Sequence, residues 1–283
     1  MGGSKILITG SNGVVGSYIP SVFTQSTLFM TTRTTMDVTN RDEVLKMANH
    51  IKPTIIIHLA ANTDVDECQK NSAAAYEVNY IGTKNIAEAA RLVRAIVIYV
   101  STCAIFDGEK KFYIESDKPN PINIYGKTKL LAEQTLINTL KKYYIIRSGW
   151  IIGGGQKEKK FISYVVKQLH DGKKEILAVE DKYGSLTYAK ELILFMKELI
   201  QNKPYGVYHF SSSGACSRFD MGRVIVQMLD VNVTVKPVKS AYFQKKFFAP
   251  RPKYEVVKSI KKQYTKTWQE TLKEYIRSEI QPA

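Results

Sequence analysis

The stretch Lys5–Gly16, "KILITGSNGVVG", joins a short apolar run to three glycines spaced three residues apart. The run "KILITG" is typical of a buried β-strand, and the glycine-rich segment after it is typical of a helix start. Gly10, Gly13 and Gly16 let the backbone turn tightly and approach a diphosphate at the helix N-terminus. A plain tight turn also fits three glycines, but strand, loop and helix in this order favour a dinucleotide-binding site. The expected cofactor contacts in this loop are Gly10, Ser11, Asn12, Gly13, Val14, Val15 and Gly16.

Apolar runs alternate with helical patterns through the first half of the chain. Near-continuous apolar strands are expected at residues 28–32, 53–61, 95–102 and 143–148. Helices are expected between them at residues 41–51, 72–94 and 126–140. Strands that are apolar throughout and separated by helices predict a parallel sheet covered on both faces. With right-handed crossovers, this pattern gives an α/β, doubly wound, Rossmann-like fold.

The length of 283 residues fits a nucleotide-binding sheet that carries a smaller lobe. Residues 1–152 are predicted to form the dinucleotide-binding domain. After Trp150 the alternation loosens into a glycine loop at residues 153–160, mixed short elements and a final helix near residues 267–280. Residues 153–283 are therefore predicted to form mainly a C-terminal α/β substrate-binding lobe, with some segments returning to the main sheet.

The composition, 44% apolar and 24% charged residues, is that of a globular protein with a sizeable core. No window approaches the roughly 18 apolar residues of a membrane span, and "MGGSKILITG" leaves no room for a signal peptide before the first strand. Cys68, Cys103 and Cys216 form no disulfide framework and no metal-binding spacing. We therefore expect a cytoplasmic protein with free thiols, no membrane association and no metal site.

The net charge of +15 raises the question of a polyanionic partner. The lysines are spread along the chain, with only a mild concentration at residues 236–266, and there is no finger, arginine-rich arm or heptad pattern. This distribution argues against nucleic acid as a partner. The attraction of a small dianion, such as a nucleotide-linked sugar, is the modest consequence that we expect.

The segment "IYGKTKLLAEQ" (residues 124–134) places Tyr125 and Lys129 four residues apart at a helix start, so their side chains share one face. A neighbouring ammonium would bring the phenol pKa, about 10 when free, toward the range useful for acid–base catalysis. Such a pair arises by chance in many helices. Here it follows a nucleotide loop, and "ST" ends the preceding strand, with Thr102 as a hydroxyl that can polarise a carbonyl. Together the three residues resemble the Thr-Tyr-Lys arrangement of extended short-chain dehydrogenases/reductases.

The end of the second strand bears on the choice of nucleotide. Sites for NAD usually carry an acidic residue there, whereas this chain has "TTRTT", with Arg33 and no carboxylate before Asp37. An arginine can bind a 2′-phosphate through charge-assisted hydrogen bonds. A solvated surface arginine is the alternative reading. We expect NADPH as the cofactor, with NADH as the second choice.

Six segments fall in order across nearly the whole chain and resemble the dTDP-4-dehydrorhamnose reductase family. They read "AANTDVDECQ", "NYIGTKNIAEAA", "VSTCAIFDG", "YGKTKLLAE", "IIRSGWIIG" and "PRPKYEVV". That family reduces the 4-keto group of a nucleotide-linked 6-deoxy-4-ketohexose. The resemblance implies hydride transfer from NADPH or NADH to C4, with Tyr125 delivering the proton to the new alkoxide. It implies that Lys129 holds the nicotinamide ribose and tunes Tyr125, and that Thr102 hydrogen-bonds the keto oxygen.

The same resemblance implies further contacts around the two ligands. Beyond the glycine loop, cofactor contacts are implied at Arg33, Asp37, Val38, Leu59, Ala60, Ala61, Asn79, Tyr125 and Lys129. Substrate contacts are implied at Thr63, Val65, Thr102, Cys103, Tyr125, Trp150 and Arg251. Trp150 matches a tryptophan that closes the sugar pocket, and Arg251 matches the arginine of an Arg-Pro motif that would contact the diphosphate or nucleotide. From the residues alone, Trp150 would more often be a core residue and Arg251 a turn charge.

Four positions depart from the family pattern. Cys103-Ala104 stands where the family usually has Asp-Tyr beside the substrate, Leu186 stands where proline is preferred, and Glu255 stands where serine is common. Losing a polar pair from a sugar pocket changes which hydroxyls are recognised. The departures therefore bear on the identity of the substrate and leave the reaction type unchanged.

Cys103 could itself take part in chemistry, because related epimerase-reductases use a cysteine near this position for proton transfer. Counting back from Ile105-Phe106 puts Ala104 at that position and Cys103 one residue early. Adjacent side chains of an extended segment point to opposite faces, so the thiol would point away. An irregular backbone would undo this argument. We favour Cys103 as a pocket residue and leave a catalytic role open.

Two other functions compete with the reduction of dTDP-4-dehydro-L-rhamnose to dTDP-L-rhamnose. The closer one is the reduction of a UDP- or GDP-linked ketosugar. The other is that of the regulatory β subunit of methionine adenosyltransferase, a non-catalytic binding partner that resembles this family and keeps a "YGKTK" segment. Retention of Thr102, Tyr125 and Lys129 favours an enzyme. Some family members use Mg²⁺ at an acidic subunit interface, for which this sequence offers no ligand set, and a homodimer is one open oligomeric state.

Overall fold

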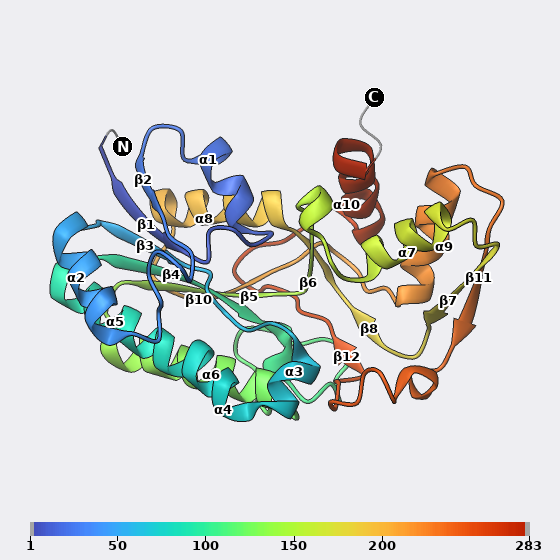
Figure 1. The fold of residues 1–283 in the computed structure, drawn as a ribbon, viewed down its shortest axis with the longest axis horizontal. Helices are drawn as coiled ribbons and strands as arrows, with labels where there is room; N and C mark the ends of the chain where they lie inside the picture. The colour runs from blue at the N-terminus through green and yellow to red at the C-terminus, as the bar shows by residue number, and fades with distance from the viewer. Residues whose placement is uncertain (1–2, 281–283) are drawn as a thin grey trace.

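The computed structural model describes residues 3–280, which fold around a parallel sheet with the strand order β10-β5-β4-β3-β1-β2 (Figure 1). Its strands are β1 (Lys5–Thr9), β2 (Thr27–Met30), β3 (Ile55–His58), β4 (Ile96–Thr102), β5 (Tyr143–Ser148) and β10 (Gly206–Phe210). Every neighbouring pair is parallel. Helices cover both faces of the sheet, which confirms the predicted α/β, doubly wound, Rossmann-like fold.

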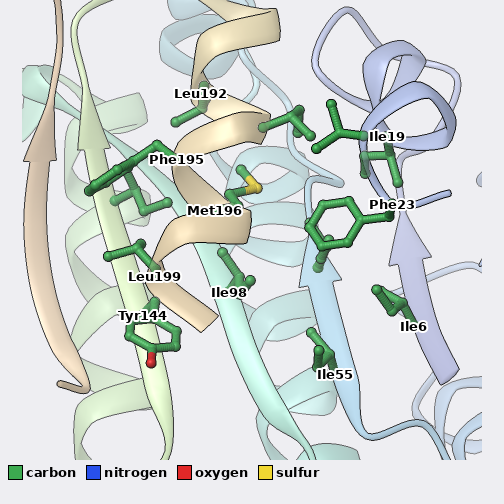
Figure 2. Packing of buried hydrophobic residues seen from close by; sticks show 14 of the residues in the cluster. Ile6, Ile19, Phe23, Ile55, Ile98, Tyr144, Leu192, Phe195, Met196 and Leu199 are labelled. Atoms are coloured by element: carbon green, nitrogen blue, oxygen red, sulfur yellow. The ribbon is translucent and has the colours of Figure 1, made fainter. Parts of the chain in front are cut away.

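The two faces of the sheet bury separate apolar clusters because successive strand residues point in opposite directions. In β1, Ile6 and Ile8 pack on one face, while Leu7 packs on the other. The helices on the Leu7 face are α2 (Arg41–Ile51), α5 (Gly82–Val93) and α6 (Ile124–Thr139). Those on the Ile6 face are α1 (Ile19–Val22) and α8 (Ala189–Asn202). Figure 2 shows side chains of α8 lying on the strands, among them Leu192, Phe195, Met196 and Leu199.

The helix after the glycine loop is shorter than the sequence pattern suggests. It consists of a 3₁₀ turn, Gly16–Tyr18, followed by the single turn of α1. Pro20 lacks the N–H that would donate to the carbonyl of Gly16, and the Ser17 hydroxyl donates to the Val14 carbonyl at 2.7 Å. Both features interrupt regular α-helical hydrogen bonding just where the helix begins.

Two further helices lie between β3 and α5. The short α3 (Val65–Lys70) was not expected, and Asp64 caps it by accepting from the N–H groups of Asp66 and Glu67. Next come α4 (Ser72–Tyr76) and a π-helical turn, Glu77–Ile81, which runs directly into α5. Residues 72–93 are thus one helical segment, as predicted, with a π turn inside it.

The remaining elements form mainly a second lobe beside the carboxyl ends of the main-sheet strands (Figure 1). Its strands are β6 (Trp150–Ile152), β7 (Glu175–Val179), β8 (Tyr183–Gly184), β9 (Leu186–Tyr188), β11 (Thr234–Val238) and β12 (Tyr254–Glu255). Its helices are α7 (Phe161–His170), α9 (Arg218–Met228) and α10 (Trp268–Tyr275), which continues as a π-helical turn, Ile276–Ile280. Short 3₁₀ turns occur at Cys103–Ile105, Gly155–Lys157 and Ser240–Phe243. The division of the chain at residue 152 stays a prediction; β10, from beyond that residue, pairs with β5 in the main sheet.

Candidate active site

The candidate site lies where the strand order of the main sheet reverses. β1 pairs with β2 on one side and with β3 on the other. Ligands of doubly wound sheets bind outside the carboxyl ends of the strands at such a point. The glycine loop follows β1 there, and Leu59, Ala60 and Ala61 follow β3. The two loops touch: a Cβ on Gly10 would lie 2.7 Å from the Ala60 nitrogen, and the φ of Gly10 is +63°, so this position requires glycine.

The geometry of the glycine loop fits a bound dinucleotide. A Cβ on Gly16 would lie 2.4 Å from the Ser11 carbonyl oxygen, so the loop folds back tightly on itself. The N–H of Gly13 donates to the carbonyl of Gly10 at 3.1 Å. Asn12 and Gly13 are exposed at the tip, where their backbone is open to a diphosphate. The other two predicted contacts, Val14 and Val15, are half-buried in the following turn.

A buried hydrogen-bond network fixes the loop after β3. The Thr9 hydroxyl oxygen accepts from the N–H groups of Leu59 and Ala60, each at 3.1 Å, and lies 2.7 Å from His58 Nδ1. On the other side, His58 Nε2 lies 3.0 Å from the Thr83 hydroxyl, which itself donates to a backbone carbonyl. The proton of the imidazole therefore sits on Nε2, and Nδ1 accepts from Thr9. Burial lowers the pKa of His58 to about 3, so the ring is neutral.

The residues expected at the adenosine end lie in the loop after β2. Arg33 is 87% exposed, and its Nε lies 3.5 Å from a carboxylate oxygen of Asp37. The backbone N–H and the hydroxyl of Thr39 donate to the other Asp37 oxygen, and together with Arg33 they lower the pKa of Asp37. Val38 is buried and covers Gly82 at the start of α5. Because its ion pair with Asp37 is long and the side chain is exposed, the Arg33 guanidinium can turn toward a 2′-phosphate.

The end of β4 and the start of α6 meet at Ala104. Thr102 is the last residue of β4, and its Oγ1 accepts from the N–H of Ala104 at 3.1 Å, which leaves its own proton to donate. A Cβ on Gly126 would lie 2.2 Å from the Ala104 oxygen, so only glycine lets the helix sit on this turn. Asn123 caps α6 by accepting from the N–H of Gly126 and donates to the carbonyl of Pro250 at 2.9 Å. The turn, the helix start and the Arg-Pro segment are therefore held together.

Tyr125 stands in the first turn of α6, beside the end of β4 that carries Thr102. Burial raises the pKa of Tyr125; the nearby Thr102 hydroxyl opposes this shift, and the neighbouring Cys103 adds to it. The expectation that Lys129 would bring this pKa down is not met, because loss of solvent around the phenol outweighs other influences. A phenol that stays protonated at neutral pH suits a proton donor.

Lys129 lies one helical turn further along α6 and is 3% exposed. Its Nζ donates to the carbonyl of Val100 at 2.8 Å and lies 4.0 Å from the centroid of the Tyr99 ring. Burial lowers the pKa of Lys129 to about 7, and the charge of Glu133, one turn further on, opposes that shift. Glu133 is itself bound by the Arg147 guanidinium through three hydrogen bonds of 2.7 to 3.1 Å. The helix face that carries Tyr125 and Lys129 thus continues to Glu133, which forms a buried ion pair with Arg147.

Asn79 lies beneath the site in the π-helical turn. Its amide donates to the carbonyl of Asn62 and to the Thr128 hydroxyl, each at 3.0 Å, and its oxygen accepts from the N–H of Asn62. In this structure Asn79 therefore braces the loop after β3 against α6. A direct contact with the cofactor stays a prediction.

The expected substrate residues Thr63 and Val65 lie at the start of α3. Thr63 is exposed and Val65 is half-buried. Later in α3, the Gln69 side chain accepts from the N–H of Ile124 at 3.2 Å, next to Tyr125. This contact sets α3 beside the first turn of α6.

Trp150, in β6, is enclosed on both faces of its indole ring. A Cβ on Gly184 would lie 2.4 Å from the ring, and the Arg218 guanidinium lies 3.9 Å from a ring centroid on the indole. The indole N–H donates to the Glu255 carboxylate at 2.8 Å. Burial raises the pKa of Glu255, and the hydrogen bond from Trp150 opposes this shift. The ring faces and the N–H of Trp150 are thus engaged within the protein, and its role in closing a sugar pocket stays a prediction.

Cys103 begins the 3₁₀ turn after β4 and is 2% exposed. It packs in a small apolar cluster with Phe106, Tyr113 and Val257. Burial raises the pKa of its thiol well above the ordinary value, and the charge of Glu255 adds to this shift. A thiol in this setting is neutral at physiological pH, which fits a packing role better than proton transfer.

Arg251, expected to contact the diphosphate, forms an ion pair with Asp66 of α3. Its Nη1 donates to Asp66 at 3.2 Å and to the carbonyl of Ala249 at 3.1 Å, and its Nη2 donates to the second Asp66 oxygen. The N–H of Ala249 also donates to Asp66 at 2.9 Å. Arg251 therefore joins the Arg-Pro segment to α3, and a role in binding the nucleotide stays a prediction.

Across the described residues 3–280, no group of three or more histidine, cysteine, aspartate or glutamate side chains is placed to hold a metal ion. The three cysteines are free and buried. Within the same range, the helices are all too short or too polar to cross a membrane.

Comparison with known proteins places these features in a family. The model of the RmlD substrate binding domain matches residues 4–280. The spore coat polysaccharide biosynthesis protein SpsK of Bacillus subtilis is 31% identical, over 97% of both chains. The dTDP-4-dehydrorhamnose reductase of Mycobacterium tuberculosis is 30% identical, over 90% of this chain and 85% of that protein.

Solved structures agree with this match. The dTDP-4-dehydrorhamnose reductase of Bacillus anthracis, determined in complex with NADP, is 32% identical and superposes with a TM-score of 0.92, over 98% of this chain and 99% of the other. The enzyme of the same name from Yersinia enterocolitica is 36% identical, with a TM-score of 0.90 over 96% and 98% of the two chains. A UDP-glucose 4-epimerase from Thermus thermophilus, 16% identical over 99% of this chain and 100% of that one, shares the fold with a TM-score of 0.81.

Several residues of the site escaped the sequence analysis. Tyr99 and His58 lie in apolar strands and look like ordinary core residues there. Asp66 pairs with Arg251, and Arg218 lies against the ring of Trp150. In both pairs the two residues are far apart along the chain. No local pattern marks such pairs, because only the fold brings them together.

Proposed function

Because this chain belongs to the family described as the RmlD substrate binding domain, we propose that it reduces the 4-keto group of a nucleotide-linked 6-deoxy-4-ketohexose. The substrate that we propose is dTDP-4-dehydro-L-rhamnose, and the product is dTDP-L-rhamnose. The chain is an enzyme, an oxidoreductase that uses a nicotinamide dinucleotide, with NADP as the form bound to its relative from Bacillus anthracis. The single observation that carries the proposal is that the first turn of α6, which carries Tyr125, packs directly on the turn that follows Thr102.

The roles of the side chains follow from their contacts. When bound, the cofactor supplies a hydride to C4 of the sugar. The Thr102 hydroxyl, whose oxygen already accepts from the N–H of Ala104, donates toward the keto oxygen and polarises the carbonyl. As the C=O double bond opens, the oxygen takes the proton of the Tyr125 phenol and becomes a hydroxyl. Lys129, fixed by the carbonyl of Val100, provides the cation next to this proton donor.

The glycine loop and Arg33 would hold the dinucleotide. The exposed backbone at Asn12 and Gly13 is suited to the diphosphate, and Arg33 to the 2′-phosphate of NADPH. The nicotinamide side of the cofactor would be lined by Leu59, Ala60 and Ala61. The Thr9 hydroxyl fixes this loop by accepting from the N–H groups of Leu59 and Ala60. NADH would lack the phosphate that Arg33 can reach.

The test is the oxidation of NADPH in the presence of enzymatically prepared dTDP-4-dehydro-L-rhamnose, followed by the absorbance of the reduced cofactor. We expect substrate-dependent consumption of NADPH and a product that co-elutes with dTDP-L-rhamnose. No consumption with either NADPH or NADH would contradict the proposal. The same assay with UDP- and GDP-linked 4-keto-6-deoxysugars tests the second candidate.

That second candidate, a reductase of another nucleotide-linked ketosugar, is favoured by the pocket side chains. Cys103 and Ala104 offer the substrate no hydroxyl or carboxylate, and Glu255 places a half-buried acceptor beside Trp150. A pocket with this set of donors and acceptors recognises a different pattern of sugar hydroxyls from one lined by aspartate and tyrosine. Higher kcat/KM with a UDP- or GDP-linked sugar would decide for this candidate.

The cytoplasmic location stays a prediction.

A further inference from the structure

Arg218 is a half-buried cation in the second lobe, at the first position of α9. Its guanidinium lies over the indole of Trp150, at 3.9 Å from a ring centroid, and 5.5 Å from the ring centroid of Phe161. Burial lowers the pKa of Arg218. The guanidinium therefore lies against two aromatic rings, and its donors point outward in its own plane.

Those donors lack an anionic partner. Within the described residues, no carboxylate lies within 4.0 Å of the Arg218 guanidinium, and its one side-chain hydrogen bond is from Nη1 to the sulfur of Met221 at 3.4 Å. The chain pairs its other enclosed arginines: Arg147 binds Glu133, and Arg251 binds Asp66. A half-buried guanidinium that has lost part of its water without gaining an anionic acceptor costs stability, and a ligand can supply that acceptor.

A small cavity lies beside Arg218. It has a volume of about 40 Å³ and is lined by Trp150, Glu158, Lys160, Phe161 and Arg218, together with three isoleucines. Lys160 likewise has no carboxylate within 4.0 Å among residues 3–280, since Glu158 accepts from its backbone N–H instead. Two cations thus border one cavity whose only carboxylate is already bound to the backbone.

The cavity and the candidate active site share Trp150. This residue lines the cavity, its ring lies against the Arg218 guanidinium, and its indole N–H donates to Glu255 at 2.8 Å. Trp150 is also the residue expected to close the sugar pocket, so a substrate bound against it would lie near Arg218. Arg251, the arginine expected to meet the diphosphate, is meanwhile bound to Asp66.

We propose that Arg218, assisted by Lys160, binds the diphosphate of the nucleotide-linked substrate. This inference rests on the proposed function, since it assigns a site for the anionic part of that substrate. The planar fork of Arg218 can give two parallel hydrogen bonds to phosphate oxygens while Trp150 fixes its plane. Lys160 adds a second positive charge without a fixed direction.

The experiment compares the binding of dTDP and of thymidine by calorimetry, with the protein saturated with NADP⁺. Charge-assisted hydrogen bonds of this kind correspond to an affinity change of about 10- to 100-fold. We therefore expect Arg218→Gln to weaken dTDP binding by about that factor and to leave thymidine binding unchanged. Arg218→Lys should fall between Arg218→Gln and the unchanged protein. Arg223→Gln, which alters an exposed arginine on the same helix, is the matched control and should bind dTDP normally.

The outcomes separate this inference from the proposed function. UDP and GDP are titrated in parallel, because the base of the substrate is part of the proposed function. If the unchanged protein binds none of the three nucleoside diphosphates, both proposals fail. If the unchanged protein binds one of them, two results overturn only the diphosphate site. In the first, Arg218→Gln binds that nucleoside diphosphate equally well. In the second, Arg218→Gln loses affinity for thymidine by the same factor as for the nucleoside diphosphate. Should Arg218→Gln not fold, as judged by circular dichroism, equal affinity in Arg218→Lys overturns the site.

Discussion

The ammonium of Lys129 lies 4.0 Å from the centroid of the Tyr99 ring, and that ring in turn stacks on His58 at 5.6 Å between centroids. A cation that has lost its water keeps some stabilisation over an aromatic face. His58 stays neutral because burial, together with the charge of Lys129, lowers its pKa to about 3. The order of cation, aromatic ring and neutral imidazole keeps a second positive charge away from Lys129.

The buried position of Lys129 should make the enzyme less stable near neutral pH than a variant with a neutral side chain. The folded-state pKa of about 7 lies below the ordinary value of 10.5, so the unfolded chain binds more protons between these two pH values. The cost is fully present below about pH 7 and is relieved as the pH rises toward 10.5. We expect Lys129→Met to raise the free energy of unfolding by about 1–3 kcal/mol at pH 7, because part of the gain is offset by the lost bond to Val100.

Urea unfolding at pH 7 and at pH 9.5 measures this effect. The difference between Lys129→Met and the unchanged protein should shrink at the higher pH, while Lys127→Met, at an exposed position on the same helix, should show no such trend. A difference that is equal at both pH values would show that the cost of burying this charge is not what separates the two proteins.

Tyr125→Phe should remove the proton donor and leave the cofactor site intact. General acid catalysis by a positioned side chain contributes about 10²- to 10⁴-fold, and we expect kcat to fall within that range. The affinity for NADPH, measured by fluorescence titration, should stay within about twofold because the glycine loop is untouched. Tyr143→Phe alters a half-buried tyrosine at the opposite end of the sheet, at the start of β5, and serves as the control. Normal turnover by Tyr125→Phe would assign the proton to another group.

Cys103→Ser should spare the reduction and lower stability. The thiol packs with Phe106, Tyr113 and Val257, and a hydroxyl in that cluster loses its hydration without a built-in partner. We expect a loss of about 1–3 kcal/mol in the free energy of unfolding with kcat nearly unchanged. Cys103→Ala, which adds no polar atom, should lose less. If Cys103→Ser abolished turnover while remaining folded, or removed an epimerisation step from the reaction, the thiol would be a proton-transfer group.

The regular elements of the first half could be predicted from the sequence with good accuracy. α2 and β5 begin and end at the residues expected, because local signals fix them. Asn40 caps the start of α2, and Lys52 adopts a left-handed conformation just after its end. β5 is a continuous apolar run between helical segments. The six-residue α3 was missed because its capping aspartate lies inside a polar stretch with no apolar periodicity.

The chemistry of the site was only partly predictable. The spacing of Tyr125 and Lys129 correctly places both on one face of α6, but their pKa values depend on burial, which the sequence does not express. The partner of Arg251 is Asp66, 185 residues away along the chain. Likewise, the covering of Trp150 by Arg218 depends on how α9 packs against β6. These features arise from tertiary packing between segments that are distant in sequence.

Arg33→Ala should weaken the binding of NADPH and leave that of NADH unchanged. The Arg33 side chain is 87% exposed and has one long contact, 3.5 Å to Asp37, so its loss removes little from the fold. A charge-assisted bond to the 2′-phosphate should be worth about tenfold in Kd, measured by fluorescence titration of each dinucleotide. Arg41→Ala, which removes an exposed arginine paired with Glu88 on the neighbouring helix, should change neither affinity. An equal loss of affinity for NADPH and NADH would mean that Arg33 contacts a part of the cofactor that both dinucleotides share. Unchanged affinities in Arg33→Ala would mean that the guanidinium is a surface charge with no role in binding.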